Sequence, residues 1–509
     1  MKIEHSEANR TRDPPPPPPA AARPRRRRRR PPPPPPRPRV CKCVGMADIG
    51  GLLADIVGES NVLTGDQISG DYGHDESLGL DAVVPSAVAM PADTTEVAAI
   101  VAVAASYGIP LTARGSGTGL SGACIPVEGG VVVSFERMNR ILELDLDNHM
   151  AVVQPGVTLE QLDRATAEVG LVYPVFPGES SASLGGNVAT NAGGMRAVKY
   201  GVTRHQVLGL EAVLGTAEVI RSGGKFVKST TGYDLTQLIV GSEGTLALVT
   251  EATLKLYPRP GHAATILAPF VALQGITAAV PKVVASGIGP LMVEYIDIMT
   301  MAAITASGGV ELGVPQHIQD AALAYLVVVL EDRRDDRLTE DVEELAILVA
   351  ELGALDVYVL PPQSGAQLIE AREKAFWLAK AAGADDLIDV VVPRAAIAAY
   401  MDEVSALAQS SGSWVSGCGH AGDGNVHLSV FQKDHHIRHQ LIHDILAAGV
   451  RLGGAISGEH GIGIGKRDHV AALESPSKIA LWRRIKLAFD PYGILNPGTI
   501  FDAVSEAKP

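Results

Sequence analysis

The sequence is poor in aromatic residues, cysteines and long apolar runs. Aromatics make up 4% of its 509 residues, so a core must rely on the aliphatic side chains within the 46% apolar content. Its four cysteines are too few for a disulfide-stabilised scaffold in a chain of this length and favour a reducing compartment. No run of 18 or more apolar residues occurs, which excludes an ordinary membrane-spanning helix. We therefore expect a cytoplasmic protein of two or three domains.

Charge is distributed unevenly along the chain. Residues 1–45 contain 11 Arg and 2 Lys against 3 acidic residues, whereas the remainder holds 30 basic and 54 acidic residues. The Pro and Arg runs of residues 1–45 predict a disordered extension. We interpret it as an overextended reading frame with the true start at Met46; the alternative is a targeting or nucleic-acid-binding arm. The acidic remainder argues against binding to nucleic acid.

The hydrophobic pattern from Asp81 onward predicts alternating strands and helices. We expect strands over 82–84, 111–113, 131–134 and 151–153, and helices over 95–107 and 158–169. Pro258-Arg259-Pro260 marks a domain boundary near residue 260. Beyond it we expect strands over 324–330 and 355–359, and helices over 338–351 and 394–409.

Three glycine-rich segments, 114–122, 177–194 and 241–246, follow one another in the first half of the chain. Glycine reaches positive φ without penalty, so such loops can turn several backbone N–H groups toward one anion, for which a diphosphate is suitable. No Gly-Lys-Ser/Thr follows, and the spacing differs from that of a Rossmann loop, so neither a Walker loop nor a nicotinamide cofactor is indicated.

A second pattern lies near the C-terminus. His420 and His427 are seven residues apart, which would put them on opposite faces of an unbroken strand. The Gly-Asp-Gly at 422–424 supplies a turn that can bring both imidazoles together, and Glu459 and His460 follow in a second glycine-rich segment. Each histidine alone could simply bond a backbone carbonyl, but two His and one carboxylate are a ligand set typical of Zn²⁺, Mn²⁺ or Fe²⁺. Zinc is our first choice.

The order of segments 91–97, 114–122, 154–157, 185–187 and 241–246 resembles the FAD-binding domain of the vanillyl-alcohol oxidase superfamily. From about residue 48 to residue 502, the chain is similar to the family that comprises the flavoprotein of bacterial glycolate oxidase, D-lactate dehydrogenase and D-2-hydroxyglutarate dehydrogenase. One departure is Ala247, where the family has glycine; one added methyl group there does not exclude FAD.

This resemblance implies an α+β fold with a two-part FAD-binding domain of the PCMH type, plus a substrate domain with an antiparallel sheet and a C-terminal helical segment. The expected organisation is a disordered extension (1–45), an FAD-binding domain (46–260), a substrate and metal-binding domain (261–488) and a C-terminal return to the FAD domain (489–509). Because the first loop contains no His or Cys, and Cys124 lies just after it, we expect non-covalent FAD.

The resemblance also implies a set of cofactor-binding residues: Pro91, Arg114, Gly115, Ser116, Gly117, Thr118, Gly119, Gly156, Pro177, Gly178, Glu179, Ser183, Gly185, Gly186, Asn187, Asn191, Gly193, Gly194, Gly241, Glu243, Gly244, Thr245 and Asn496.

In the family, a D-2-hydroxy acid is oxidised to its 2-oxo acid, with hydride passing to flavin N5 and a divalent metal lowering the pKa of the hydroxyl. The resemblance assigns His420, His427 and Glu459 as metal ligands and His460 as the catalytic base. It assigns Asn425 and Arg372 to substrate binding, and a guanidinium suits a carboxylate.

One helical turn after Arg372 lies Phe376 rather than a polar residue, which favours a short monocarboxylic substrate such as D-lactate or glycolate. D-2-hydroxyglutarate or another dicarboxylate is the alternative. The electron acceptor is expected to be external: a quinone, an electron-transfer flavoprotein or a cytochrome. Peripheral membrane contact and oligomer formation stay open, and no nucleic-acid partner is expected.

Two readings belong to other classes of protein. A metal-dependent hydrolase would use His420, His427 and Glu459 but would leave the glycine-rich segments unexplained. A non-catalytic binding protein would rest entirely on the basic residues 1–45.

Overall fold

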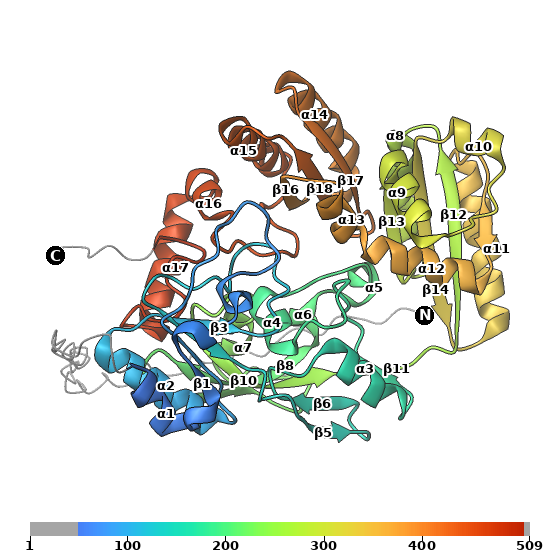
Figure 1. The fold of residues 1–509 in the computed structure, drawn as a ribbon. Helices are drawn as coiled ribbons and strands as arrows, with labels where there is room; N and C mark the ends of the chain where they lie inside the picture. The colour runs from blue at the N-terminus through green and yellow to red at the C-terminus, as the bar shows by residue number, and fades with distance from the viewer. Residues whose placement is uncertain (1–48, 503–509) are drawn as a thin grey trace, which may run out of the picture. The chain divides into compact units, whose positions relative to one another are not determined.

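The computed structural model describes residues 49–502, so the expectations for residues 1–45 lie outside the described part of the chain. The described strands form a four-stranded sheet, a five-stranded sheet, a two-stranded ribbon and a seven-stranded sheet (Figure 1). The first two sheets come from the part of the chain with the glycine-rich segments, and the seven-stranded sheet comes from the part after residue 260.

The four-stranded sheet has the order β1-β2-β4-β3, with β2, β4 and β3 parallel and β1 antiparallel to β2. Helix α2 (Thr94–Tyr107) connects β2 to β3 and packs Val97, Ile100 and Val101 into the core. The carboxylate of Asp93 caps it by accepting the N–H groups of Thr95 and Glu96. The strands are β1 (Val62–Leu63), β2 (Ala87–Ala89), β3 (Leu111–Arg114) and β4 (Val131–Ser134).

The strand expected at 82–84 is wrong. Val84 is 70% exposed and is followed by Pro85, whereas the strand β2 begins only at Ala87. Residues Ala87–Ala89 are fully buried because they pair with Val131–Val133 in the middle of the sheet. Pairing with β4, which the local sequence pattern does not show, therefore determines that residues 87–89 rather than 82–84 form the strand.

The five-stranded sheet is antiparallel, with the order β5-β6-β10-β8-β9, and buries one apolar cluster under α3 and α4. Thr158 caps α3 in a capping box with Gln161. The elements are β5 (Ile141–Asp145), β6 (Met150–Val153), α3 (Leu159–Ala167), α4 (Leu184–Thr190), β8 (Val207–Leu214), β9 (Val219–Gly223), α7 (Leu235–Ile239) and β10 (Ala247–Lys255), with β7 (Leu171–Val172) and β11 (Tyr257–Pro258) forming the ribbon.

The seven-stranded sheet is antiparallel throughout, with the order β15-β12-β14-β13-β17-β18-β16. The expected strand at 355–359 lies at Tyr358–Leu360, where it pairs with β12. The strands are β12 (His262–Phe270), β13 (Met292–Asp297), β14 (Ala324–Asp332), β15 (Tyr358–Leu360), β16 (Asp386–Val391), β17 (Trp414–His420) and β18 (Asn425–Phe431).

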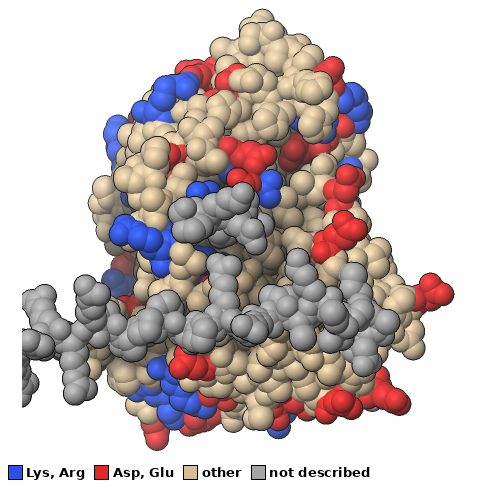
Figure 2. Space-filling model, turned by 90° about the vertical axis from the view of Figure 1, so that its left-hand side faces the viewer, with Lys and Arg blue, Asp and Glu red and all other residues tan. Residues whose placement is uncertain are grey.

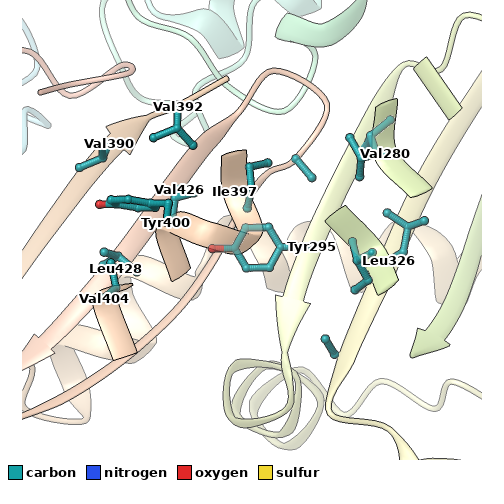
Figure 3. Packing of buried hydrophobic residues seen from close by; sticks show 14 of the residues in the cluster. Val280, Tyr295, Leu326, Val390, Val392, Ile397, Tyr400, Val404, Val426 and Leu428 are labelled. Atoms are coloured by element: carbon teal, nitrogen blue, oxygen red, sulfur yellow. The ribbon is translucent and has the colours of Figure 1, made fainter. Parts of the chain in front are cut away.

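Helices cover the two faces of this sheet unequally. Side chains of α8, α11, α14 and α15 pack on one face. There Tyr400 is fully buried beside Val390, Val426 and Leu428, and the buried Tyr295 lies between Ile397 and Leu326 (Figure 3). On the other face, α9 and α12 pack against β12, β13 and β14. The helices are α8 (Leu273–Ala285), α9 (Ile298–Gly308), α11 (Asp335–Glu351), α12 (Pro362–Glu373), α14 (Ile397–Ser410) and α15 (His435–Arg451).

The last described residues return to the four-stranded sheet. Leu495 forms a parallel bridge with Leu111 of β3, and the Asn496 N–H donates to the Leu111 carbonyl at 2.7 Å. The remaining helices are α1 (Ile49–Val57), α5 (Ala197–Tyr200), α6 (Thr203–Gln206), α10 (Gln316–Ala321), α13 (Ala375–Ala381), α16 (Arg467–Leu473) and α17 (Pro476–Phe489), with short 3-10 turns at Glu59–Asn61, Gly65–Gln67, Gly70–Gly73 and Arg394–Ala396.

Within residues 49–502, no helix combines the length and the apolar character needed to cross a membrane. On the face drawn in Figure 2, acidic side chains lie among the basic ones over the described residues. That face therefore presents mixed charge rather than the continuous basic surface that a phosphate backbone requires.

Candidate active site

Four neighbouring strands each contribute one polar residue to the same face of the seven-stranded sheet. β17 and β18 form a hairpin in which Cys418 pairs with His427, so His427 and His420, two residues from Cys418, share a face. Asp389 of β16 pairs directly with His427. Glu294 lies two residues before Ile296, which pairs with Cys418. The turn at 421–424 is thus the one that the Gly-Asp-Gly sequence predicts.

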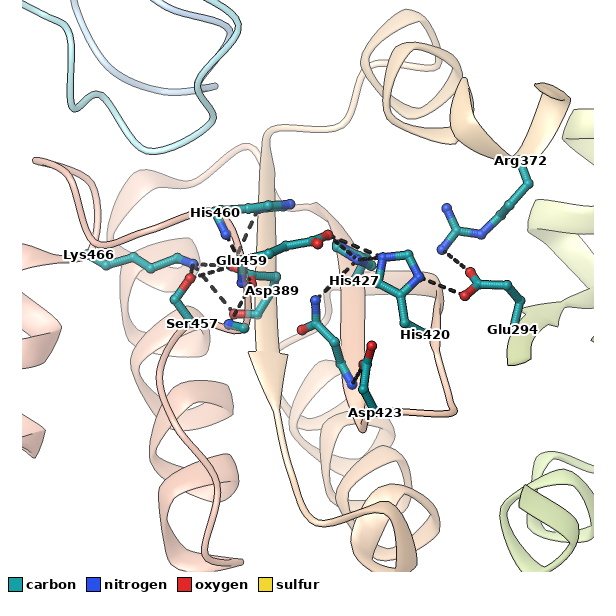
Figure 4. A network of polar contacts seen from close by, with 12 residues as sticks. Glu294, Arg372, Asp389, His420, Asp423, His427, Ser457, Glu459, His460 and Lys466 are labelled. Carbon is teal, nitrogen blue, oxygen red and sulfur yellow. Dashed lines mark hydrogen bonds and ion pairs between the residues drawn. The ribbon is translucent and has the colours of Figure 1, made fainter. Parts of the chain in front are cut away.

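The ring nitrogens of the two histidines converge on one carboxylate (Figure 4). His420 Nε2 and His427 Nε2 are 3.1 Å apart and lie 3.2 and 3.0 Å from Glu459 Oε1. These three atoms can stay this close only when they share a positive charge, which either a proton on an imidazole or a metal ion supplies. With metal–ligand bonds of about 2.0–2.1 Å, a tetrahedral site spaces its ligand atoms roughly 3.3 Å apart. The three residues therefore fit a divalent ion.

Glu294 supports this cluster from behind. Its fully buried Oε1 lies 2.7 Å from His420 Nδ1, an arrangement that fixes the orientation of a metal-binding imidazole. Burial lowers the pKa of His420, but the negative charges of Glu294 and Glu459 outweigh it and hold that pKa well above its ordinary value. Sequence analysis missed Glu294, although a lone acidic residue within the apolar run 292–296 was a visible signal.

Asp389 positions the segment that carries Glu459. Its buried carboxylate accepts the backbone N–H groups of Gly458 at 2.6 Å and Glu459 at 2.7 Å, and it pairs with Lys466. Burial raises the pKa of Asp389, but the positive fields of His460 and Lys466 outweigh this and hold it well below its ordinary value. Sequence analysis missed both Asp389 and Lys466, because the pairing joins residues far apart in the chain.

His460 lies beside this carboxylate. Its Nδ1 is 3.4 Å from Asp389 Oδ1, and its ring centroid is 5.1 Å from that of His427. Burial lowers the pKa of His460 to about 4, although Asp389 partly opposes the shift. The imidazole is therefore neutral near pH 7, with Nδ1 turned toward Asp389.

The glycine-rich segments enclose a cavity with about 1240 Å³ of empty space, part of it open to solvent; we call it the glycine-loop cavity. Glu459 and His460 line one part of it. The residues predicted to bind the cofactor that line this cavity are Gly115, Ser116, Gly117, Thr118, Gly119, Pro177, Gly178, Glu179, Ser183, Gly186, Asn187, Gly193, Glu243 and Gly244.

The other predicted cofactor residues lie elsewhere. Arg114 donates to the His74 carbonyl at 2.7 Å instead of facing the cavity. Gly185 lines a smaller neighbouring cavity, and Gly194 lines the cavity that contains Arg372. The residues that line neither the glycine-loop cavity nor these two are Pro91, Arg114, Gly156, Asn191, Gly241, Thr245 and Asn496.

The glycine-loop cavity fits a nucleotide cofactor. Asn187 is 4% exposed, and its amide Nδ2, a hydrogen-bond donor, has no partner among the described residues. A cavity ligand with acceptor oxygens would satisfy it. A Cβ at position 115 would collide with the Ser183 side chain, so the backbone there approaches the second loop as only glycine allows.

Glu243 connects the third glycine-rich segment to the metal-site segment. Its carboxylate accepts the N–H groups of Ile462 at 2.8 Å and Gly463 at 2.7 Å. The Asn496 amide donates to the Glu243 carbonyl at 2.7 Å and to the Ala123 carbonyl at 2.8 Å. These two predicted cofactor residues therefore position the walls of the site through backbone contacts.

A second cavity, with about 1180 Å³ of empty space, shares Glu459 and His460 with the glycine-loop cavity; we call it the Arg372 cavity. Arg372 is 7% exposed, and its Nε and Nη2 have no hydrogen-bond partner among the described residues. Nη2 forms an ion pair with Glu294 Oε2 at 3.0 Å, without hydrogen-bond geometry. Asn425 lines neither cavity; its Nδ2 lies 3.4 Å from His427 Nε2.

Comparisons with known proteins agree with this architecture. Residues 85–223 match the FAD binding domain family, and residues 259–500 match the FAD linked oxidases, C-terminal domain. An uncharacterized FAD-linked oxidoreductase of Mycobacterium tuberculosis is 56% identical over 90% of this chain and 99% of its own length. A D-lactate dehydrogenase of Anaerostipes hadrus is 35% identical over 87% and 95%. The crystal structure of p-cresol methylhydroxylase with substrate bound has a TM-score of 0.73 at 19% identity, covering 89% of this chain and 96% of that one.

Fold and sequence together define an FAD-linked oxidoreductase with the two-domain FAD-binding fold of the vanillyl-alcohol oxidase type. The chain belongs to the family that contains D-lactate dehydrogenases, glycolate oxidase subunits GlcD and D-2-hydroxyglutarate dehydrogenases. Membership of a redox family argues against the hypothesis of a metal-dependent hydrolase. The hypothesis of a non-catalytic binding protein depends on residues 1–45, which lie outside the described part of the chain.

Replacing Asn187 by Leu should weaken FAD binding, because the near-isosteric side chain lacks the unpartnered amide that faces the cavity. We expect a dissociation constant about threefold to tenfold higher, measured by titrating apoprotein with FAD and following flavin fluorescence. The melting temperature of the apoprotein serves as the control for folding. An unchanged FAD affinity would remove Asn187 from the cofactor site.

Replacing Asp389 by Asn should leave Lys466 buried beside a neutral amide, at a cost of about 3–5 kcal/mol in the free energy of unfolding, measured by urea titration. It should also lower the metal content, because an amide must place its NH₂ group either where Oδ2 accepts the backbone N–H groups of Gly458 and Glu459 or where Oδ1 pairs with Lys466. Asp386→Asn on the same strand is the matched control, since Asp386 makes none of these contacts to 457–460. Equal effects of the two substitutions would contradict the positioning role.

Proposed function

We propose that this protein oxidises a D-2-hydroxy monocarboxylic acid, of the D-lactate or glycolate type, to the 2-oxo acid and passes the electrons to an external acceptor such as a quinone, an electron-transfer flavoprotein or a cytochrome. One observation carries the proposal. Arg372 and the His420–His427–Glu459 cluster line the Arg372 cavity, which shares His460 and Glu459 with the glycine-loop cavity. An anion-binding group, a metal-binding group and a base therefore line the part of the Arg372 cavity next to the glycine-loop cavity.

The unpartnered guanidinium of Arg372 supports binding of the substrate carboxylate. A buried cation with unpartnered N–H groups gains strongly from a planar anion, and Arg372 shares the Glu294 carboxylate with His420. Binding by Arg372 would hold the adjacent hydroxyl group toward His420, His427 and Glu459, because these residues line the same cavity.

His460 is the proposed acceptor of the hydroxyl proton. Its Nδ1 faces Asp389, so Nε2 is left to accept the proton, and Asp389 would stabilise the resulting imidazolium. When bound, a divalent metal at His420, His427 and Glu459 would polarise the hydroxyl oxygen, and FAD would supply the two-electron oxidant that takes the C2 hydrogen.

The proposal is tested by anaerobic bleaching of the flavin absorption band with D-lactate, glycolate and D-2-hydroxyglutarate, each chiral acid beside its L-isomer. We expect bleaching by D-2-hydroxy monocarboxylic acids and weak or no response to the L-isomers. A flavin that is reduced neither by these acids nor by D-2-hydroxy acids with longer side chains would refute the proposed reaction.

Replacing His460 by Ala should leave FAD bound but lower the rate of flavin reduction by about 10²–10⁴-fold, the usual contribution of a general base, measured by anaerobic stopped-flow absorbance. His435→Ala is the control, because His435 lies on the exposed face of α15. Normal flavin reduction in the His460 variant would exclude the base assignment.

Chelation should abolish flavin reduction without releasing FAD, because the proposed ligands lie apart from most of the glycine-loop cavity. Adding Zn²⁺ or Mn²⁺ should restore the activity, and metal content measured by mass spectrometry should follow it. His420→Ala should contain little metal and should not respond to added ions. Full activity of metal-free protein would refute the metal assignment.

A further inference from the structure

The Arg372 cavity extends well beyond the groups that would hold a hydroxy acid. Along β17, residues Cys418, Ser416 and Trp414 continue the face that carries His420, and along β18, Ser429 and Phe431 continue the face that carries His427. The register pairs Ser416 with Ser429 and Trp414 with Phe431. From the Cys418–His427 pair to the Trp414–Phe431 pair this floor runs roughly 13 Å, at about 3.3 Å per residue.

Apolar side chains form the walls and the mouth of this extension. Helix α9 contributes Met299, Ala303 and Ile304, and α13 contributes Phe376 and Ala379. The mouth is apolar as well: Met299 is 53% exposed and Trp414 is 49% exposed, with the Trp414 ring stacked on Phe431 at a centroid distance of 4.6 Å. Exposed apolar side chains that gather at the mouth of a cavity are typical of a ligand-binding groove.

Charge limits what this extension can accept. Among the described residues that line the cavity, Arg372 is the only Lys or Arg, and the acidic residues are Glu373 and Glu459. A second carboxylate at the far end would lose its hydration without gaining a positive partner. The uncharged hydroxyls of Ser416 and Ser429 lie on the floor, but they add no charge. A dicarboxylate such as 2-hydroxyglutarate therefore fits poorly.

A very small side chain would fill only part of the cavity. The hydrogen of glycolate or the methyl group of lactate would leave the floor between Ser416 and Trp414 in contact with water. Each further buried methylene group should improve binding roughly fourfold.

We propose that the Arg372 cavity selects D-2-hydroxy acids with a long or aromatic apolar side chain, which lies on the floor of β17 and β18 between α9 and α13. The inference rests on the proposed function, since it places the carboxylate at Arg372 and the hydroxyl at the metal site. It narrows the D-2-hydroxy monocarboxylic acids of the proposed function to those whose side chain is larger than the methyl group of lactate.

The first experiment compares kcat/KM of the FAD- and metal-loaded enzyme for D-lactate, D-2-hydroxybutyrate, D-2-hydroxyoctanoate, D-phenyllactate and D-2-hydroxyglutarate with a dye acceptor. We expect D-2-hydroxyoctanoate or D-phenyllactate to exceed D-lactate by about tenfold or more, and D-2-hydroxyglutarate to be the weakest chiral acid. Oxidation of D-lactate with no gain from longer side chains would overturn the inference and leave the proposed function standing.

The second experiment uses a matched pair of variants on α13. Ala379 lines the cavity, whereas Ala381, two residues further along the same helix, lines neither cavity. Ala379→Trp should lower the ratio of kcat/KM for D-2-hydroxyoctanoate to that for D-lactate by about tenfold, and Ala381→Trp should leave this ratio unchanged. If this ratio were the same in both variants, the substrate side chain would not lie beside α13, and the inference would be overturned.

The third experiment measures binding without catalysis. The dissociation constants of pyruvate and 2-oxo-octanoate for the oxidised enzyme are determined by calorimetry, where tighter binding of 2-oxo-octanoate with a more negative heat-capacity change indicates apolar burial. Equal affinities would overturn the inference. If no 2-hydroxy acid bleaches the flavin, the proposed function fails, and the inference about its substrate fails with it.

Discussion

The buried carboxylate of Asp389 is the constraint on which the geometry of the site depends. It fixes the backbone of Gly458 and Glu459 by hydrogen bonds and is itself compensated by Lys466. Without this compensation a fully buried negative charge would be too costly to keep. Because Asp389 pairs with His427 across β16 and β18, the same carboxylate sets the distance between Glu459 and the two histidines. Asp389 therefore couples the register of β16 and β18 to the position of the loop that carries Glu459.

Much of the local structure could be predicted from the sequence. The helices expected over 95–107 and 158–169 form as α2 and α3, which begin after the capping residues Asp93 and Thr158, because capping chemistry is local. The hairpin that unites His420 and His427 followed from the Gly-Asp-Gly between them. The glycine-rich segments indicated a shared cavity, which most of the predicted cofactor residues line.

The rest depended on long-range pairing. The strand β2 lies at Ala87–Ala89 rather than at 82–84, since only the later triplet reaches the strand β4. Glu294 and Asp389 approach the metal-binding cluster from distant parts of the chain. Lys466 lies near Glu459 in sequence, but it is connected to the site only through Asp389, which no local pattern shows. Arg114 was expected among the cofactor-binding residues; its guanidinium donates to the His74 carbonyl, a contact between distant parts of the chain that no local pattern shows.

The alternation of side chains along β18 couples the geometry of the metal-binding cluster to the shape of the cavity floor. His427, Ser429 and Phe431 occupy successive positions on one face of the strand, so the residue that approaches the metal-binding cluster and those that form the cavity floor share one register. A single-residue insertion or deletion between Asn425 and His427 would turn all three to the opposite face. A length change in this hairpin therefore keeps the face when it falls within the turn at 421–424, when it adds or removes two residues, or when a β-bulge absorbs it. Replacement of single side chains changes the cavity without this constraint.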